Sequence, residues 1–367
     1  MPADAPYVAV VDGVPVPRHS QQMPGTAWLK APRTPPWKPG PHRAQRFAHL
    51  AGLLPLRWEP AFPPKAVPAA AAPRTQWQAA LAEIAWLRAQ LDATGRREQR
   101  LLVLGDGDYD VAGLWAGLPA GATLMTRCAR NRARYALPAP EQRRGAPRTY
   151  GPRARRPPAW LRARAGWQRA QLPVRGRTIP VRYRVAGPFV VKGAPAQPVF
   201  LLVVPGIDRR ARRLRRDPAY WLVTAAREGE QWVLPLPAEE LLAWAWQRWE
   251  VEVCHRELKS GFGLGEVQCW NPTSAVLAVQ WQAWADGVLV LAGYRAWGLT
   301  GAPLRPPALW WRGARRWSLG TLWRGYRQAL WGATEFRALW TGTGAEWGEK
   351  ATWLGGLGNA VAGSLRA

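Results

Sequence analysis

The feature that most constrains this chain is the alternation of aliphatic and helical segments over residues 75–129. Arg100–Asp106 (RLLVLGD) is an aliphatic run that ends in Gly and Asp, which is typical of a buried strand. Before it, Thr75–Leu91 has apolar residues at helical spacing, with Thr75 placed to cap the helix. After it, Asp110–Leu118 predicts a short helix and Ala122–Ala129 another strand. Strands and helices that alternate in this way predict an α/β sheet.

The N-terminal segment predicts two more strands around a turn. Tyr7–Val16 (YVAVVDGVPV) is rich in β-branched residues on both sides of Asp12-Gly13, the dipeptide most typical of a tight hairpin turn. Leu53–Trp58 is a candidate third strand. The order of elements up to residue 129 is therefore three strands, helix, strand, helix, strand.

The charge of the chain indicates a polyanionic partner. Its 367 residues include 51 Lys and Arg against 24 Asp and Glu, a net charge of +27. Codon bias toward Arg explains a basic composition, but it does not explain clustering. Between Arg127 and Arg184 there are 17 Arg and one acid, Glu141, and a second run, RRARRLRR, covers Arg209–Arg216. Clusters of this kind favour a surface that faces nucleic-acid phosphates.

Other features set the domain organisation and exclude some classes of protein. We expect four segments: residues 1–130 and 236–300 form two parts of one core, 131–235 is a β-rich and Arg-rich insertion, and 301–367 is a helical C-terminal region. Three Cys with no CxxC pair argue against a disulfide framework or a zinc site. No secretory signal is visible, and Asp286 and Arg295 interrupt the apolar stretch Ser274–Leu299, which we expect to fall short of a membrane span. These features predict a soluble, cytoplasmic protein.

A polar stripe lies on the long helix predicted to begin at Pro237. Arg248, Glu252, His255 and Lys259 share one narrow arc at helical spacing. The opposite face is apolar and is expected to pack on the protein; it consists of Leu242, Ala245, Trp249 and Val253. Taken alone, the stripe is equally consistent with a solvated face stabilised by i,i+4 ion pairs.

The residues around this stripe resemble a known family. The segment QRWEVEVCHRELKSGFGL has the spacing Arg-x3-Glu-x6-Lys, which resembles the Tyr-Arg-Glu-Lys signature of one group of bacterial cut-and-paste DDE transposases. The resemblance implies that Glu252 is the third catalytic carboxylate and that Arg248 and Lys259 approach DNA phosphates. The tyrosine of the signature is absent, because Ala245 stands in its place.

The resemblance also requires two upstream aspartates on adjacent strands. Asp106 in LVLGDGDYD follows a predicted strand and has Tyr109 three residues later, as in the family, although Asp108 and Asp110 are nearby alternatives. Asp12 in VAVVDG is the only acid in a strand-like context near the start, and it is also explained as a turn residue. The intervals of 94 and 146 residues between the three acids are similar to those of family members with a β-rich insertion.

If the resemblance holds, the fold is an RNase H-like mixed five-stranded sheet flanked by helices and interrupted by the insertion. The protein is then a DNA transposase that cleaves and transfers DNA strands with two Mg²⁺ ions, for which Mn²⁺ can substitute. The metal ligands are Asp12, Asp106 and Glu252. The basic residues expected on DNA are Arg248, Lys259, His255, Arg256, Arg209, Arg210, Arg212 and Arg213.

The expected partner is double-stranded DNA, both transposon ends and target, bound by a homodimer in the bacterial cytoplasm at the nucleoid. Family members usually carry an end-binding domain ahead of the first aspartate, and because only 11 residues precede Asp12 we expect that domain to be missing here. Two alternatives therefore stay open. One is a catalytically inactive, truncated transposase remnant that binds DNA non-specifically, and the other is a basic nucleic-acid-associated structural protein whose three acids are coincidental.

The second Arg cluster gives a first prediction. If Arg209, Arg210, Arg212 and Arg213 contact phosphates, replacing them with Ala should flatten the dependence of log K for DNA binding on log salt. The slope should change by about 0.9 for each phosphate that the protein no longer neutralises. Fluorescence anisotropy of labelled duplex DNA over a salt series measures this slope. A slope equal to that of the wild type would show that the cluster does not face DNA.

Overall fold

The structure of the protein is a computed structural model. It describes residues 5–18, 20, 22–30, 41–52, 54–61, 75–139, 148–174, 177–209, 214–267, 269–298 and 319–334. The chain divides into two compact units. Unit 1 comprises Met1–Val253 and Gln268–Ala278, and unit 2 comprises Cys254–Val267 and Val279–Ala367. Each unit is described by itself.

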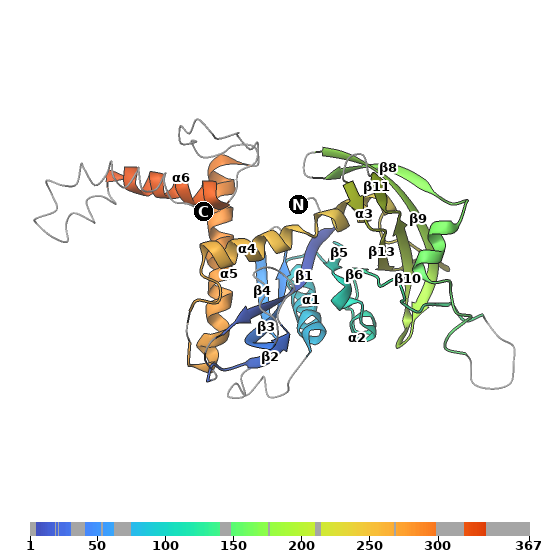
Figure 1. The fold of residues 1–367 in the computed structure, drawn as a ribbon, viewed down its shortest axis with the longest axis horizontal. Helices are drawn as coiled ribbons and strands as arrows, with labels where there is room; N and C mark the ends of the chain where they lie inside the picture. Colours follow the sequence, from blue (N-terminus) through green and yellow to red (C-terminus); the bar gives the residue numbers. More distant parts are fainter. Residues whose placement is uncertain are drawn as a thin grey trace, which may run out of the picture. The chain divides into compact units, whose positions relative to one another are not determined.

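Unit 1 is built on one mixed β-sheet of eleven strands, which confirms the α/β class (Figure 1). Along the sheet the main path is β2-β3-β1-β5-β6-β13-β10-β9-β7, with β4 paired to β3 and β8 paired to β9. The strands are β1 (Tyr7–Pro17), β2 (Thr26–Lys30), β3 (Pro41–Ala51), β4 (Pro55–Pro60), β5 (Leu101–Gly105), β6 (Ala122–Arg127), β7 (Tyr135–Ala136), β8 (Gln168–Val174), β9 (Arg177–Val191), β10 (Ala194–Val204) and β13 (Ala219–Thr224).

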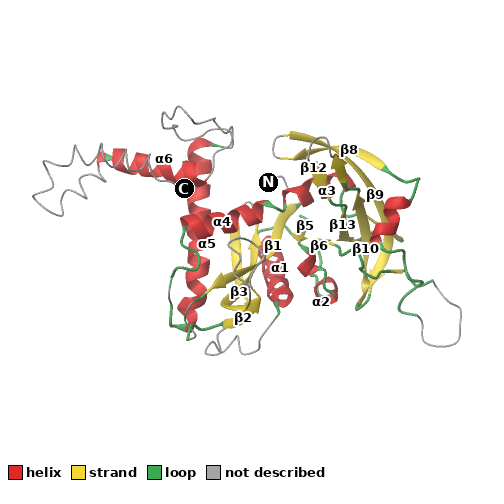
Figure 2. Ribbon diagram, viewed as in Figure 1, coloured by secondary structure: helices red, strands yellow, loops and turns green. Residues whose placement is uncertain are grey.

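Two small hairpins, six α-helices and two short 3-10 helices (Gly107–Tyr109 and Pro157–Arg162) complete the described secondary structure, which Figure 2 colours by type. The hairpins are β11 (Ile207–Arg209) with β12 (Leu214–Arg216) and β14 (Ala226–Glu228) with β15 (Gln231–Val233). The helices are α1 (Gln76–Ala93), α2 (Ala112–Ala116), α3 (Ala238–Gln247), α4 (Glu250–Gly261), α5 (Pro272–Trp297) and α6 (Leu319–Gly332). Of the predicted helical C-terminal region, only α6 lies within the described residues.

The predicted hairpin at the N-terminus is wrong. β1 is one continuous strand that passes straight through Asp12-Gly13. Its antiparallel partner is β3, in which His49 lies opposite Asp12 and Ala48 opposite Gly13. On its other edge β1 pairs in parallel with β5. Long-range hydrogen bonding on both edges therefore overrides the local preference of Asp-Gly for a turn.

Two apolar layers fix the faces of the sheet. On one face, Ala9, Val11 and Val103 pack with the buried residues of α1 and α2. On the other face, Leu102 and Leu104 pack with buried residues of α3 and of the β8–β9 hairpin. Alternate residues of a strand point to opposite faces, so the side chains of Asp12 and Asp106 belong to the face covered by α3.

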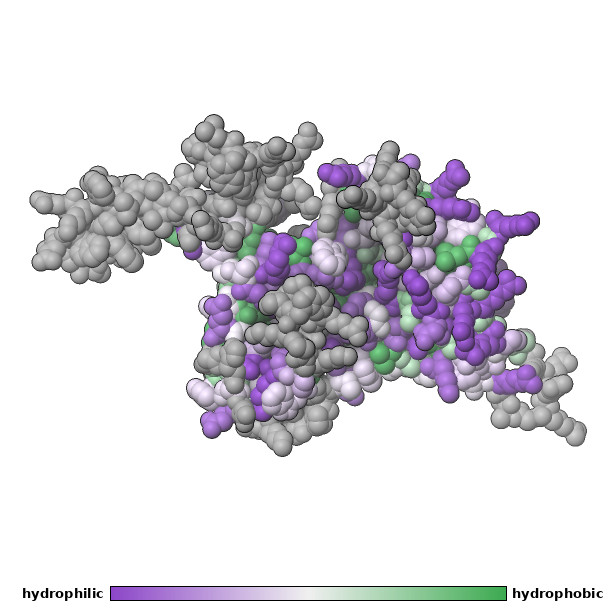
Figure 3. All heavy atoms as spheres, in the orientation of Figure 1, coloured by the Kyte–Doolittle hydropathy of each residue, from purple (hydrophilic) through white to green (hydrophobic). Residues whose placement is uncertain are grey.

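The predicted β-rich insertion continues the core sheet. β13 pairs antiparallel with β6, the last strand of the core, so the strands of the insertion extend the sheet well beyond the five strands expected for the core. In β8 and β9 the residues Leu172, Val174 and Val181 are buried, whereas Arg169 and Arg182 are exposed. Hydrophilic residues cover much of this part of the molecule in Figure 3. The hairpin therefore presents an apolar side to α3 and a basic side to solvent.

The predicted long helix from Pro237 is two helices. α3 ends at Gln247, a turn follows at Arg248-Trp249, and α4 begins at Glu250. At this turn the amide of Glu252 donates to the carbonyl of Trp249 across 3.1 Å, an i to i−3 bond that tightens the backbone. The apolar face predicted for a continuous helix is consequently wrong in part, because Trp249 is 54% exposed and Val251 is buried instead.

Unit 2 contains most of α5. We predicted that the apolar stretch Ser274–Leu299 falls short of a membrane span. That prediction is wrong by length and composition, because α5 is long enough and apolar enough to cross a membrane even with its two charged residues. One such helix in the described part of the chain is weak evidence for a membrane, since core helices of soluble proteins share these properties.

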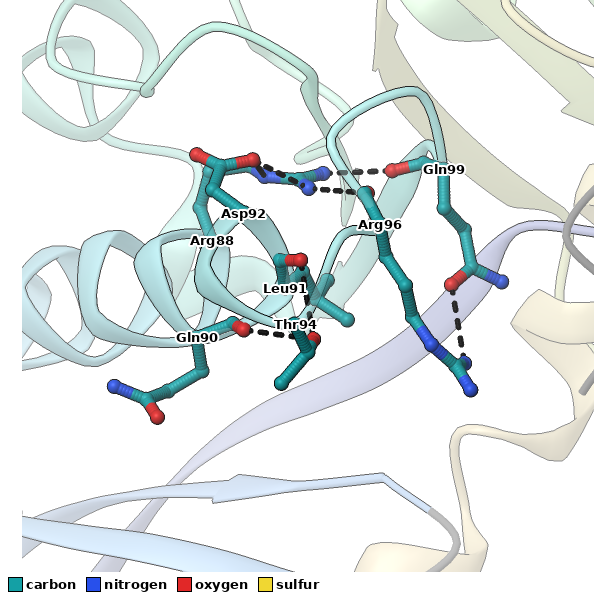
Figure 4. Close-up of polar contacts among 7 residues, drawn as sticks. All are labelled: Arg88, Gln90, Leu91, Asp92, Thr94, Arg96 and Gln99. Carbon is teal, nitrogen blue, oxygen red and sulfur yellow. Dashed lines mark hydrogen bonds and ion pairs between the residues drawn. The ribbon is translucent and has the colours of Figure 1, made fainter.

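The connection from α1 to β5 is fixed by one buried cation, which Figure 4 shows in close-up. Arg88 is almost fully buried and forms an ion pair of 2.8 Å with Asp92. Its guanidinium also donates to the backbone carbonyls of Gln99, at 2.6 Å, and Arg96, at 2.8 Å. The side chain of Gln99 in turn donates to the carbonyl of Ala5, just before β1. These bonds tie the starts of β1 and β5 together.

We therefore predict that Arg88→Ala lowers the free energy of unfolding by about 2–3 kcal/mol, because it leaves buried carbonyls without donors. Chemical denaturation followed by circular dichroism measures the change. The exposed Arg97 in the same connection is the matched control, and Arg97→Ala should change stability by less than about 0.5 kcal/mol. Equal effects of the two variants would contradict the assigned role of Arg88.

Candidate active site

Asp12 lies in a row of side chains that crosses three strands. Its opposite residue on β3 is His49, and the residue opposite His49 on β4 is Trp58. His49 and Trp58 are both buried, and their rings stack with centroids 4.3 Å apart. Residues directly opposite one another share a face of the sheet, so His49 is the lateral neighbour of Asp12 on the β3 side.

Asp106 is level with Asp12 on the other side of β1. Val10 pairs in parallel with Leu104, and each aspartate follows two residues later along the chain. Asp106 caps the 3-10 turn Gly107–Tyr109, because its carboxylate accepts a hydrogen bond of 2.9 Å from the amide of Asp108. The position of Asp106 is thus set by β5 before it and by a capped turn after it.

Tyr109 holds the turn that follows Asp106. It is fully buried, and its hydroxyl accepts a hydrogen bond of 3.0 Å from the side chain of Gln76 at the start of α1. A β-carbon on Gly105 would come within 2.9 Å of the Tyr109 side chain, so the glycine is required for this close approach. Burial raises the pKa of Tyr109 well above its ordinary value, which keeps its hydroxyl protonated.

Glu252 and Arg248 enter the site from the junction of α3 and α4. They form an ion pair, with 2.8 Å between Nη2 of Arg248 and Oε1 of Glu252. Nη1 of Arg248 is buried and has no hydrogen-bond partner among the described residues. Arg248 therefore neutralises one carboxylate and keeps a further donor for another acceptor.

The pKa values show that these groups share one electrostatic environment. The pKa of Asp12 is raised to about 6, first by burial and next by the negative charge of Asp106. The charge of Glu252 raises it further, whereas Arg248 and the amide of Gly13 lower it. The pKa of Asp106 is also raised, chiefly by burial, with opposing effects of Glu252 and Arg248. The structure thus brings together Asp12, Asp106, Arg248 and Glu252.

Carboxylate oxygens are ligands that suit a hard divalent cation, and the charge of Glu252 acts on the pKa of both aspartates. No group of three or more His, Cys, Asp or Glu in the described part of the chain has an arrangement that could hold a metal ion. Oε1 of Glu252 is engaged by Arg248 in the ion pair described above. Coordination of one metal site by all three acids would require a different arrangement of these side chains.

The two acids near Asp106 occupy different environments. Asp108 has a side chain that is 71% exposed and lies 3.9 Å from the guanidinium of Arg46. The side chain of Asp110 is only 5% exposed and pairs with Arg132 at 3.1 Å. Its carboxylate also accepts a hydrogen bond from the indole of Trp115. Asp110 thus has a structural role in anchoring α2, and Asp108 lies on the surface.

Two further residues of this region belong to no recognisable sequence motif. One is His49, whose proximity to Asp12 depends on the pairing of β1 with β3. The other is Arg127, the last residue of β6, whose pKa is lowered mainly by burial and also by the positive charge of Arg248. Because β5 and β6 are parallel, their carboxyl ends lie at the same edge of the sheet. Once the strands are known, Arg127 is therefore expected at the same edge as Asp106.

The other basic residues expected on DNA are distributed over both units. His255, Arg256 and Lys259 lie on the part of α4 that belongs to unit 2, where Arg256 and Lys259 are exposed and His255 is buried. Arg209 ends β11, and its three companions lie outside the described residues; these are Arg210, Arg212 and Arg213. The DNA contacts of all these residues stay predictions.

Tryptophans near the site serve the packing of unit 1. Trp221 is buried, 5.8 Å from the ring of Trp246, and the guanidinium of Arg127 lies over it at 5.4 Å. Trp246 is covered in the same way by Arg216. These contacts connect α3 to the insertion and so support the position of the α3–α4 junction.

The sequence of the chain matches no protein-family model, and no curated protein matches it. The functional interpretation therefore depends on the residues and geometry described above.

The raised pKa of Asp12 predicts a pH-dependent effect on stability. The folded state favours the protonated form of a carboxyl whose pKa is raised by folding. The contribution of Asp12 to the stability of the folded state is therefore complete below about pH 4 and is lost as the pH rises through about 6. In the presence of a chelator, Asp12→Asn should therefore increase the free energy of unfolding at pH 8 by about 1–2 kcal/mol, with little effect at pH 4.

Denaturation curves at the two pH values test this expectation. Asp108→Asn is the control, because Asp108 is exposed and should contribute less than about 0.5 kcal/mol at either pH. A loss of stability in Asp12→Asn at pH 8 would show that the carboxylate is favourable where it lies, which contradicts its placement among like charges.

Proposed function

We propose that this chain is the catalytic core of a DNA transposase of the RNase H-like DDE type, which cleaves and transfers DNA strands. The observation that carries the proposal is that strand register sets Asp12 and Asp106 at one level of the sheet and that the charges of Glu252 and Arg248 act on the pKa of both, although 94 and 146 residues separate the three acids. Each of the three acids belongs to a separate sequence motif. An unrelated basic protein with coincidental acids has no reason to bring them together.

The order of the core strands supports the same assignment. Five strands run β4-β3-β1-β5-β6, with β3 antiparallel to β1, and β5 and β6 parallel to it. α1 lies in sequence between β4 and β5, and α2 between β5 and β6. In our proposal these are the five strands of an RNase H-like core, with Asp12 in one central strand and Asp106 directly after the other.

The carboxylates fit a reaction at phosphorus. Two Mg²⁺ ions, when bound, activate the attacking oxygen of water or of a DNA 3′-hydroxyl and stabilise charge on the leaving oxygen, and Mn²⁺ fits the same ligands. In our proposal Asp12, Asp106 and Glu252 are the residues that would hold these ions. The residues themselves orient the ligands: the β1–β5 pairing fixes the two aspartates, and the α3–α4 junction presents the glutamate.

The cations around the carboxylates fit the phosphates of the substrate. Nη1 of Arg248 is buried and has no hydrogen-bond partner in the described residues. The positive charge of Arg248 also lowers the pKa of Arg127, so the two cations lie in the same region. Release of Glu252 from Arg248 would free the whole guanidinium for a phosphate oxygen. The exposed arginines of the insertion, such as Arg169 and Arg182, add sequence-independent contacts to double-stranded DNA. A DNA partner places the protein in the bacterial cytoplasm, at the nucleoid, where we expect it to act as a homodimer on DNA.

One alternative has a specific observation in its favour. The ion pair between Arg248 and Glu252, together with Ala245 at the place of the signature tyrosine, is compatible with a catalytically inactive protein that only binds DNA. The two functions share the same fold and the same basic surface. They differ in whether the carboxylates perform chemistry.

The distinguishing variant is Glu252→Gln. Gln keeps the size and one oxygen but removes the charge that a metal ion requires, so Mg²⁺-dependent nicking of plasmid DNA should fall by about 1,000-fold or more. DNA affinity should stay within about threefold. The fold should be retained, because a partly exposed i,i+4 ion pair contributes only about 0.3–0.5 kcal/mol.

The matched control is Glu250→Gln, an exposed acid on the same helix that should nick DNA like the wild type. The assay should include DNA that already carries 3′-hydroxyl nicks, so that loss of end recognition is not mistaken for loss of chemistry. Absence of cleavage by the wild type with both Mg²⁺ and Mn²⁺ would establish the inactive alternative. Cleavage by Glu252→Gln at the wild-type rate would show that Glu252 is not a ligand.

A further inference from the structure

One side of α5 in unit 2 exposes large apolar side chains. Trp281, Trp284, Val288 and Leu291 are 69%, 56%, 67% and 40% exposed. Isolated apolar residues on a surface are ordinary, but a contiguous set of this size marks an interaction surface. We name these four residues the α5 stripe.

The spacing of the α5 stripe is that of a helix–helix seam. Its members follow one another at intervals of three, four and three residues, the alternation of a and d positions in a heptad. On a helix with 3.6 residues per turn they lie within an arc of about 80°. A partner that fits such a narrow seam is another helix, with its side chains set between those of the stripe.

The opposite side of α5 is already packed within unit 2. Gln282 is buried and donates to the carbonyls of Phe262 and Gly263, both at 3.0 Å. Gly293 lies so close to α6 that a β-carbon there would come within 2.6 Å of the Leu322 side chain. α5 is thus held by the protein on one side, and the α5 stripe is left facing outward.

The lack of charge around the α5 stripe indicates which kind of partner can pack on it. The chain carries a net charge of +27, but residues 279–294 contain a single charged residue, Asp286, which is buried. The positions that flank the seam are small and uncharged; they include Ala285, Gly287 and Ala292. Along residues 279–294 a second copy of this strongly basic chain meets no like charge and no bulky flank. Arg295, which is exposed on the same side of the helix one turn beyond Leu291, marks the end of this neutral stretch.

We propose that the α5 stripe is the surface through which two copies of this chain associate, helix against helix, about a twofold axis. A twofold axis sets the same patch against itself, and an apolar seam with neutral flanks is self-complementary. The lack of basic residues makes DNA a poor occupant, and the packed opposite side makes α5 a poor free-standing membrane helix. The association does not depend on DNA or on the proposed catalytic function.

Sedimentation equilibrium of nuclease-treated protein in about 1 M salt tests the proposal, because those conditions remove nucleic-acid bridges and screen charge while preserving apolar contacts. We expect a dimer with Kd on the order of 1–10 µM, as four apolar side chains per copy offset the entropy of association. Val288→Arg should raise the Kd of the dimer at least tenfold, because it sets two like charges together in the seam. Trp284→Ala should also raise the Kd, because it removes apolar contact area.

The control is Ser260→Arg, which adds the same charge at an exposed position of α4 and should leave the dimer unchanged. Both stripe positions are exposed, so circular dichroism should show wild-type folding in every variant. A wild-type protein that stays monomeric up to about 100 µM would overturn the proposal, as would a dimer that is indifferent to Val288→Arg. So would binding of the wild type, but not of Trp284→Ala, to neutral phosphatidylcholine vesicles, which would assign the stripe to lipid.

Discussion

The parallel pairing of β1 with β5 is the interaction on which the site depends. It sets Asp12 and Asp106 at one level of the sheet and on one face, although 94 residues separate them. The pairing is secured at its start by Arg88 and Gln99, and at its end by the buried Tyr109 against Gly105. A shift of one residue along either strand would move one aspartate to the opposite face and would dissolve the site.

The same geometry has an electrostatic cost. Carboxylates in a partly buried place repel one another, and the pKa of Asp12 is raised first by burial and next by the charge of Asp106. Arg248 offsets part of the cost through its ion pair with Glu252. An arrangement that is unfavourable for folding and is maintained by so many packed residues is typical of a functional site. The β8–β9 hairpin contributes to it by packing on α3, which leads into the junction that carries Glu252 and Arg248.

Local patterns predicted the elements whose signals are contained within them. The aliphatic run of β5, the helical spacing of α1 and the Thr75 cap, where Gln78 accepts a hydrogen bond from the Thr75 amide, are all confirmed. The charge of Glu252, the acid in the motif, acts on the pKa of both aspartates, and its catalytic role stays a prediction. These successes share a cause, since each signal involves side chains within a few turns of one another.

The predictions that were wrong depend on contacts between residues far apart in the sequence. Whether Asp12-Gly13 turns or continues is decided by β3, some forty residues away, and no local rule contains that information. The break between α3 and α4 has no Gly or Pro to announce it, so the periodicity continued through Arg248 and assigned Trp249 to the wrong side. His49 and Arg127 became visible only when strand register was known. Sequence alone thus indicated the acids, whereas their neighbours required the fold.

Anomalous diffraction from crystals grown with Mn²⁺ tests the central claim most directly. We predict two anomalous peaks at this edge of the sheet, about 3.5–4 Å apart, with Asp12 shared between them and Glu252 released from Arg248. Bound Mn²⁺ elsewhere and none at these carboxylates, or carboxylates that stay too far apart to share an ion, would contradict it.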